Sequence, residues 1–142
     1  RDLHLSIRRQ RQMCIRDRLR HLNVYQKSLE SLNGIVCFSV KALSNLSILK
    51  LLDDHGSGFD IVSGGELHRC IKAGIDPKKI IFSGVGKSAD EIALALKVGI
   101  LSFNVESESE LYRIEKIADD IESPAPISIR INPDMIQADM TI

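Results

Sequence analysis

The feature that most constrains the fold of this 142-residue chain is a regular alternation between short apolar runs and segments with helical spacing. Five apolar runs recur at intervals of roughly 20 to 25 residues, and four helical segments separate them. Near-continuous apolar runs are typical of parallel strands that are buried on both faces. Because parallel strands need a crossover connection, usually a helix, the alternation predicts a parallel α/β sheet with right-handed crossovers.

The expected elements follow one another without long gaps. Asn45, Ser88 and Ser107 can accept hydrogen bonds from the first N–H groups of a helix, so we expect each to begin one. The expected helices cover residues 22–32, 46–55, 66–73, 89–98 and 108–121, and the expected strands cover residues 35–40, 59–62, 79–83, 100–105 and 127–131. An eight-stranded barrel and an open doubly wound sheet share this pattern, so periodicity alone leaves both open.

The amino-terminal segment differs from the rest of the chain. Residues 1–20 hold seven arginines and two aspartates, a net charge of +5, although the whole chain is formally neutral. Residues 6–18 lack helical or strand periodicity and join abruptly to a well-patterned sequence. We therefore expect residues 1–20 to be a non-native or disordered basic segment and residues 21–142 to be the folded part. Nucleic-acid binding by the basic segment stays an alternative.

Composition narrows the class of protein. Hydrophobic residues make up 44% of the chain, which is enough for a real core. No apolar run approaches the roughly 20 residues that cross a bilayer, and the amino-terminal end lacks the apolar centre of a secretory signal. Cys14, Cys37 and Cys70 are odd in number and lack metal-ligand spacing, which favours reduced thiols. We expect a cytoplasmic protein without a metal site, and low aromatic content argues against a nucleic-acid platform.

A single lysine ends the first apolar run. Residues 35–40 have the character of a buried strand, and Lys41 follows directly. We expect the stem of Lys41 to lie in the core and its amine to lie at the rim. A partly desolvated lysine amine is a nucleophile toward carbonyl groups. On position alone, a surface lysine that caps a strand is the favoured explanation.

Polar residues follow several of the other expected strands. They are Asp60 with Ser63, Gly84 to Lys87, Asn104 with Glu106, and Arg130. The carboxyl ends of the strands of a parallel barrel meet at one mouth, so these side chains would converge there.

Five motifs in order resemble those of the pyridoxal-phosphate decarboxylases of the alanine-racemase-like barrel type, and among these the diaminopimelate decarboxylases. The resemblance spans about residues 25–134. The motifs are Cys37-Phe38-Ser39-Val40-Lys41-Ala42, Gly58-Phe59-Asp60-Ile61-Val62-Ser63-Gly64-Gly65-Glu66-Leu67, Phe82-Ser83-Gly84-Val85-Gly86-Lys87-Ser88, Phe103-Asn104-Val105-Glu106-Ser107-Glu108 and Ile129-Arg130-Ile131-Asn132-Pro133.

The resemblance implies roles for four residues. Lys41 matches the lysine that binds pyridoxal 5'-phosphate covalently, Asp60 and Ser63 match positions in the active-site wall, and Arg130 matches an arginine near the cofactor's ring oxygen. A strand-end turn explains Asp60 equally well. Leu43 departs from the family, which commonly has asparagine there and so a further polar contact near the cofactor.

The resemblance also implies a fold and a reaction. It favours the first five or so strands of a (β/α)8 TIM-type barrel over the open sheet, and so a truncated, inactive fragment of a homodimeric enzyme. The implied reaction is the decarboxylation of meso-2,6-diaminopimelate to L-lysine in lysine biosynthesis. An ornithine- or arginine-type decarboxylase and a non-catalytic barrel that binds pyridoxal phosphate stay as alternatives.

Three further polar residues invite simpler explanations. Glu66 stands in the first turn of an expected helix, where a carboxylate offsets the helix dipole. Lys87 and Ser88 resemble the end of a phosphate loop, but that motif needs a glycine where this chain has Ile81. We therefore expect Ser88 to be a helix cap and Lys87 to be a cation at the rim that attracts an acidic substrate.

Overall fold

The computed structural model describes residues 2–32 and 34–131, with side chains described from residue 16 onward. The strands are β1 (Cys37–Ser39), β2 (Gly58–Ile61), β3 (Ile80–Phe82), β4 (Ser102–Val105) and β5 (Ile127–Ile129). The helices are α1 (Asp2–Leu29), α2 (Leu46–Asp54), α3 (Gly64–Lys72), α4 (Ala89–Val98) and α5 (Glu108–Asp120), with short 3-10 turns η1 (Glu30–Leu32), η2 (Val40–Ala42) and η3 (Pro77–Lys79). The predicted alternation of strands and helices is confirmed.

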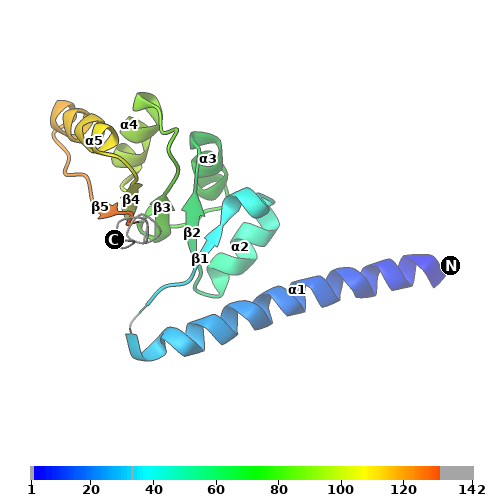
Figure 1. The fold of residues 1–142 in the computed structure, drawn as a ribbon. Helices are drawn as coiled ribbons and strands as arrows, with labels where there is room; N and C mark the ends of the chain where they lie inside the picture. Colours follow the sequence, from blue (N-terminus) through cyan, green and yellow to red (C-terminus); the bar gives the residue numbers. More distant parts are fainter. Residues whose placement is uncertain (1, 33, 132–142) are drawn as a thin grey trace, which may run out of the picture.

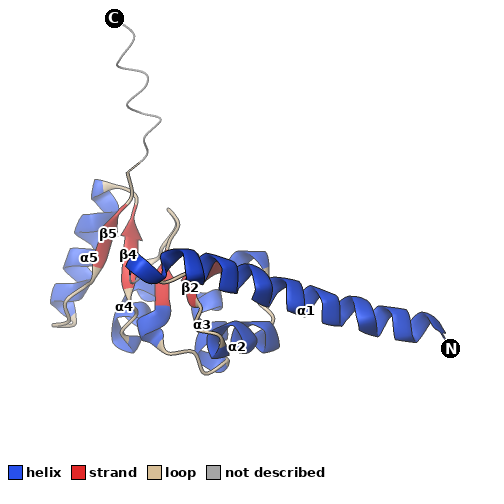
Figure 2. Cartoon of the chain, turned by 90° about the horizontal axis from the view of Figure 1, so that it is seen from below, coloured by secondary structure: helices blue, strands red, loops and turns tan. Residues whose placement is uncertain are grey.

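The five strands form one parallel sheet in the order β1-β2-β3-β4-β5. A doubly wound sheet reverses its strand order at a switch point, whereas a barrel wall adds each strand beside the last one. With right-handed crossovers, this sequential order puts all the connecting helices on one face. Figures 1 and 2 show α2 to α5 along that outer face. The sheet is thus part of a TIM-type barrel, as the family resemblance implied.

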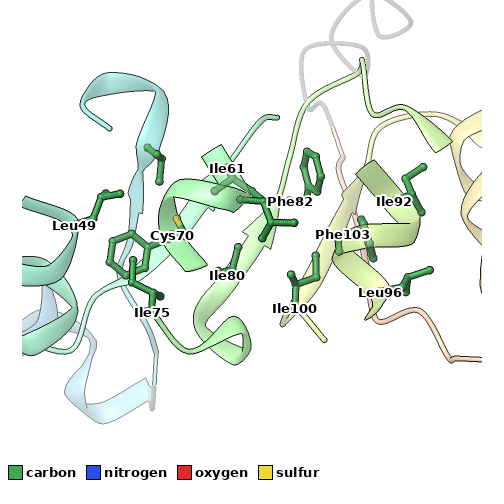
Figure 3. Close-up of a cluster of buried hydrophobic side chains, with 14 of the residues drawn as sticks. Leu49, Ile61, Cys70, Ile75, Ile80, Phe82, Ile92, Leu96, Ile100 and Phe103 are labelled. Carbon is green, nitrogen blue, oxygen red and sulfur yellow. The ribbon is translucent and has the colours of Figure 1, made fainter. Parts of the chain in front are cut away.

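The hydrophobic core lies between the sheet and these helices. Alternate strand residues that face the helices are fully buried, among them Phe59, Phe82 and Phe103. The rings of Phe82 and Phe103 stack with their centroids 6.1 Å apart, and Figure 3 shows side chains of α4 beside them. Full burial of such a side chain is worth about 1.5–3 kcal/mol. Because the helix side takes the apolar residues, the opposite face of the sheet is left for polar ones.

The helices begin as their capping residues predict. The Asn45 side chain accepts hydrogen bonds from two N–H groups at the start of α2. Ser63, Ser88 and Ser107 each accept a hydrogen bond from the N–H group three residues on, in α3, α4 and α5. Each cap lies a few residues after the end of a strand, at the start of the next helix. The loops that carry the strand-end residues therefore lie along the same edge of the parallel sheet.

Helix α1 differs from the predicted helix at residues 22–32. It begins at Asp2, because arginine, glutamine and leucine favour helix even where no apolar face recurs. Of the predicted apolar face, Leu22 is buried, whereas Tyr25 and Leu32 are exposed. The proposed boundary at residue 20 stays a prediction, and the predicted stop at Asn33 lies outside the described residues.

Among the helices of the described residues, none combines the length and the apolar character needed to cross a membrane.

Candidate functional site

A chain of polar side chains crosses the face of the sheet opposite the helices. Asn104 on β4 donates a hydrogen bond of 2.8 Å from its amide nitrogen to the Ser83 hydroxyl, at the end of β3. The Ser83 hydroxyl in turn donates to a carboxylate oxygen of Asp60 on β2. Asp60 lies between Phe59 and Ile61, which are buried toward the helices, so its carboxylate points to the other face. The predicted convergence therefore holds for the ends of these three strands.

A second polar group joins β4 to β5. The Glu106 carboxylate accepts a hydrogen bond of 2.8 Å from the Gly84 N–H and pairs with Arg130 Nη1 at 2.9 Å. Gly84 has a φ angle of +96°, which favours glycine. Arg130 is the exposed partner, since 65% of its side chain is accessible against 13% for Glu106. The predicted cofactor residue Arg130 is thus held at the strand ends by an acidic neighbour.

Lys41 has a different environment from the predicted one. It is exposed, and it lies in η2, directly after β1 ends at Ser39. The turn sends Val40 into the core with no exposed surface and leaves Lys41 outside, so the expectation of a buried stem was wrong. Among the described contacts, no hydrogen bond or ion pair involves the Lys41 amine, which is therefore available to a ligand.

Ser39, two residues before Lys41 in the sequence, carries a buried polar atom, its hydroxyl oxygen, without a hydrogen-bond partner in the described part of the chain. Ser39 stands in register with Asp60 on the next strand. A buried hydroxyl without a partner is costly, so this position favours the binding of a polar group that forms a hydrogen bond with the Ser39 hydroxyl.

Lys87 is not the rim cation that the sequence predicted. It is 2% exposed, and its amine donates to the carbonyl groups of Gly84 and Asn104 at 2.7 and 2.8 Å and to Glu110 at 2.5 Å. The amine also lies 5.7 Å from the centre of the Phe82 ring. A lysine ammonium has three N–H donors, and all three are used inside the protein. Lys87 is therefore a structural cation that joins the end of β3 to β4 and α5.

Glutamate carboxylates accept hydrogen bonds from backbone N–H groups at the helix starts along the same edge. Glu66 accepts a hydrogen bond of 2.8 Å from the Val62 N–H, which confirms its expected structural role. Ser63 is occupied as the cap of α3, with its hydroxyl 3.3 Å from the Glu66 nitrogen. Any contact of Ser63 with a cofactor would therefore be made in addition to this cap.

Glu91 links two helix starts. Its carboxylate accepts from the N–H and hydroxyl of Ser88 in a capping box on α4, and from the Gly64 N–H of α3 at 2.6 Å. The Ser88 N–H, followed by the Gly64 N–H, lowers the pKa of Glu91 below its ordinary value. An added Cβ at Gly64 would lie 2.9 Å from the Glu91 side chain, so glycine permits this close approach.

The described thiols are suited to packing rather than to nucleophilic chemistry. Burial, with a smaller effect of the Asp60 charge, raises the pKa of Cys37. Burial, followed by the Glu66 charge, raises the pKa of Cys70 to about 12. Cys70 is a core residue as predicted, whereas Cys37 is only partly buried. Among residues 16–32 and 34–131, no cluster of histidine, cysteine and acidic side chains could hold a metal ion.

Sequence reasoning missed the partners of the polar residues. Ser83, Glu106 and Glu110 each bind a group that lies more than 20 residues away. One signal was present, because Ser-x-x-Glu follows three of the strands, and each glutamate accepts a hydrogen bond from a backbone N–H at its own helix start. The second contacts of Glu91 and Glu110, with neighbouring units, have no local signal.

The comparisons with known proteins agree on one family. The model described as "Pyridoxal-dependent decarboxylase, pyridoxal binding domain" matches residues 16–142. Diaminopimelate decarboxylase of Vibrio cholerae is 52% identical over 116 residues, which cover 82% of this chain and 28% of that relative. The chain thus spans less than a third of that relative's length.

Solved structures give the same result. A crystal structure of diaminopimelate decarboxylase from Helicobacter pylori, complexed with L-lysine, is 51% identical with a TM-score of 0.78 and covers 82% of this chain and 30% of that chain. Ornithine decarboxylase from Entamoeba histolytica is more distant, at 29% identity with a TM-score of 0.68 over 82% of this chain and 34% of that chain. The similarity to the diaminopimelate decarboxylase is thus greater than the similarity to the ornithine decarboxylase.

Proposed function

Because this chain belongs to the pyridoxal-dependent decarboxylase family, we propose that it forms the amino-terminal part of the cofactor site of a diaminopimelate decarboxylase. The proposal rests mainly on three groups along one edge of the sheet. Lys41, which has no partner among the described residues, follows β1, the Asp60 carboxylate lies on β2, and the Arg130 guanidinium follows β5. The identity of about 50% to diaminopimelate decarboxylases supports this substrate over ornithine or arginine.

The residues present fit pyridoxal 5'-phosphate. The cofactor carries an aldehyde, an anionic ring oxygen and a phosphate. Within the described part of the chain, the Lys41 amine and the Ser39 hydroxyl have no hydrogen-bond partner, and Arg130 has guanidinium N–H donors beyond the one that binds Glu106. When bound, the cofactor supplies an electron sink that accepts the electrons left behind as carbon dioxide departs.

Each of the proposed residues has a defined task. Lys41 Nζ, once deprotonated, would hold the cofactor covalently at its aldehyde carbon, with the aldehyde oxygen leaving as water. Arg130 would donate hydrogen bonds to the anionic ring oxygen. The Asp60 carboxylate, oriented by Ser83, accepts a hydrogen bond from the lysine or cofactor, and Ser63 contributes to the wall beside it. The site thereby replaces one carboxylate of meso-2,6-diaminopimelate with a proton, which gives L-lysine and carbon dioxide.

The test uses the full-length protein that we propose contains this chain. Borohydride reduction in the presence of pyridoxal phosphate should fix the cofactor to the peptide that carries Lys41, as identified by mass spectrometry. Lys41→Ala should abolish this labelling, whereas the control Lys72→Ala, an exposed lysine on α3, should retain it. Labelling of Lys41→Ala at the wild-type level would refute the assignment.

Turnover separates the alternatives. The full-length protein should release carbon dioxide from meso-2,6-diaminopimelate faster than from ornithine or arginine, and preference for either of those would indicate the related enzyme class. Cofactor labelling without any turnover would instead indicate a non-catalytic barrel. The present chain alone should be inactive, so measured turnover by residues 1–142 would contradict the proposal of a fragment.

Assembly and location follow from the resemblance alone. We expect the full-length protein to be a cytoplasmic homodimer that takes a small amino-acid substrate and binds neither nucleic acid nor membrane. Analytical ultracentrifugation of the full-length protein tests the dimer.

A further inference from the structure

We propose that Glu106 is a positioning residue that holds Arg130 in place for the cofactor, an inference that rests on the proposed function. The two side chains pair at 2.9 Å through one guanidinium nitrogen, Nη1. An arginine has five N–H donors, so a single contact leaves the remaining donors free for an anion. Glu106 can therefore orient Arg130 without occupying the face that would bind a ligand.

Glu106 is itself fixed from two directions. Its other carboxylate oxygen accepts a hydrogen bond of 2.8 Å from the Gly84 N–H. Its backbone N–H donates to the Glu110 carboxylate at 2.9 Å. With 13% of its side chain exposed, the carboxylate cannot move freely to follow the arginine. The pair therefore has one fixed member and one mobile member.

A buried cation completes this support. Lys87 binds the Gly84 and Asn104 carbonyl groups and the carboxylate of Glu110. Gly84 is thereby held at its C=O by Lys87 and at its N–H by Glu106. The contacts run from the core through Gly84 and Glu110 to Glu106, and they end at Arg130.

Arg130 needs such support because β5, the strand that it follows, is exposed. All three residues of β5 are exposed, and the Arg130 backbone is tied to β4 by a hydrogen bond from its N–H to the Val105 carbonyl. A long arginine side chain has large rotamer freedom, which binding would have to restrict. Prior restriction by Glu106 lowers that cost, so its loss should weaken cofactor binding.

An exposed ion pair without a function is the competing explanation. Such pairs change stability slightly and have no reason to affect ligand affinity through one particular arginine. A double-mutant cycle on cofactor affinity distinguishes the two explanations, because only a positioning role makes the effect of Glu106 depend on Arg130.

The experiment measures the dissociation constant for pyridoxal phosphate in the full-length protein by equilibrium dialysis. Glu106→Gln keeps an oxygen for the Gly84 N–H but removes the charge that holds Arg130, and affinity should fall about tenfold. In the Arg130→Ala background the same change should have no further effect. The control Glu115→Gln, an exposed glutamate on α5, should leave affinity unchanged.

The outcomes separate this inference from the proposed function. Wild-type protein that binds no pyridoxal phosphate would overturn both. Normal wild-type binding, with no effect of Glu106→Gln or with effects of the two changes that simply add, would overturn the positioning role alone. If Glu106→Gln fails to fold by circular dichroism, Glu106→Asp replaces it in the cycle, and its loss of affinity must again vanish in the Arg130→Ala background.

Discussion

Two lysines at the same sheet edge have opposite surroundings. Lys87, after β3, is 2% exposed and uses all three of its donors inside the protein. Lys41, after β1, is exposed and makes no ion pair among the described residues. The difference teaches that the role of a lysine at a strand end depends on the hydrogen-bond acceptors around its amine rather than on its position in the sequence. A saturated ammonium stabilises the fold, whereas an unsaturated one is available to a ligand.

The largest effect should follow from Lys87→Met in the full-length protein. The change leaves the buried Glu110 carboxylate without its cation, and removing one partner of a buried pair costs about 3–5 kcal/mol of unfolding free energy. Urea unfolding followed by circular dichroism measures the loss.

A second variant tests the reason for that loss. Lys87→Met combined with Glu110→Leu removes both charges, and it should regain a large part of the stability. A loss below about 1 kcal/mol for Lys87→Met would mean that the pair is not buried in solution, and the contrast with Lys41 would then fail.

Gly84→Ala should have the next largest effect. Its cost comes from the backbone, because φ is +96° and the nearest side chain, Val62, lies 3.5 Å from an added Cβ. A residue with a side chain at positive φ loses about 1–2 kcal/mol, which urea unfolding can measure. Gly86→Ala is the matched control, since no atom lies within 4 Å of its added Cβ and it is not among the glycines at positive φ. Equal losses for both variants would contradict the conclusion that the positive φ angle at Gly84 requires glycine.

Glu91→Gln should have a smaller effect that depends on pH. Hydrogen bonds from the Ser88 and Gly64 N–H groups lower the pKa of Glu91 in the folded protein. Its stabilisation is therefore present above the unfolded pKa of roughly 4.3 and is lost as the pH falls through the lower folded value. We expect a loss of about 1 kcal/mol at pH 7 that shrinks in acid, measured by urea unfolding across pH 3–7. A loss that stays constant over this range would contradict the charged contact.

Local features of the fold could be predicted from the sequence, and long-range ones could not. Asn45 and Ser88 begin helices because their partners lie two or three residues away. Lys87 was wrongly placed at the rim because its anion, Glu110, lies 23 residues further on. The exposure of Lys41 depends on where β1 ends and η2 begins, and an apolar run does not define that point.

The smallest effect should come from Lys41→Met, and it tests the other side of the comparison. No described contact is lost when this exposed amine is removed, so the free energy of unfolding without cofactor should change by less than about 0.5 kcal/mol. The same variant should lose all borohydride-fixed cofactor. A residue that is dispensable for the fold and indispensable for the cofactor has its function in ligand chemistry. A stability loss comparable to that of Lys87→Met would instead show that Lys41 is a second structural cation, because only lost internal contacts produce such a loss.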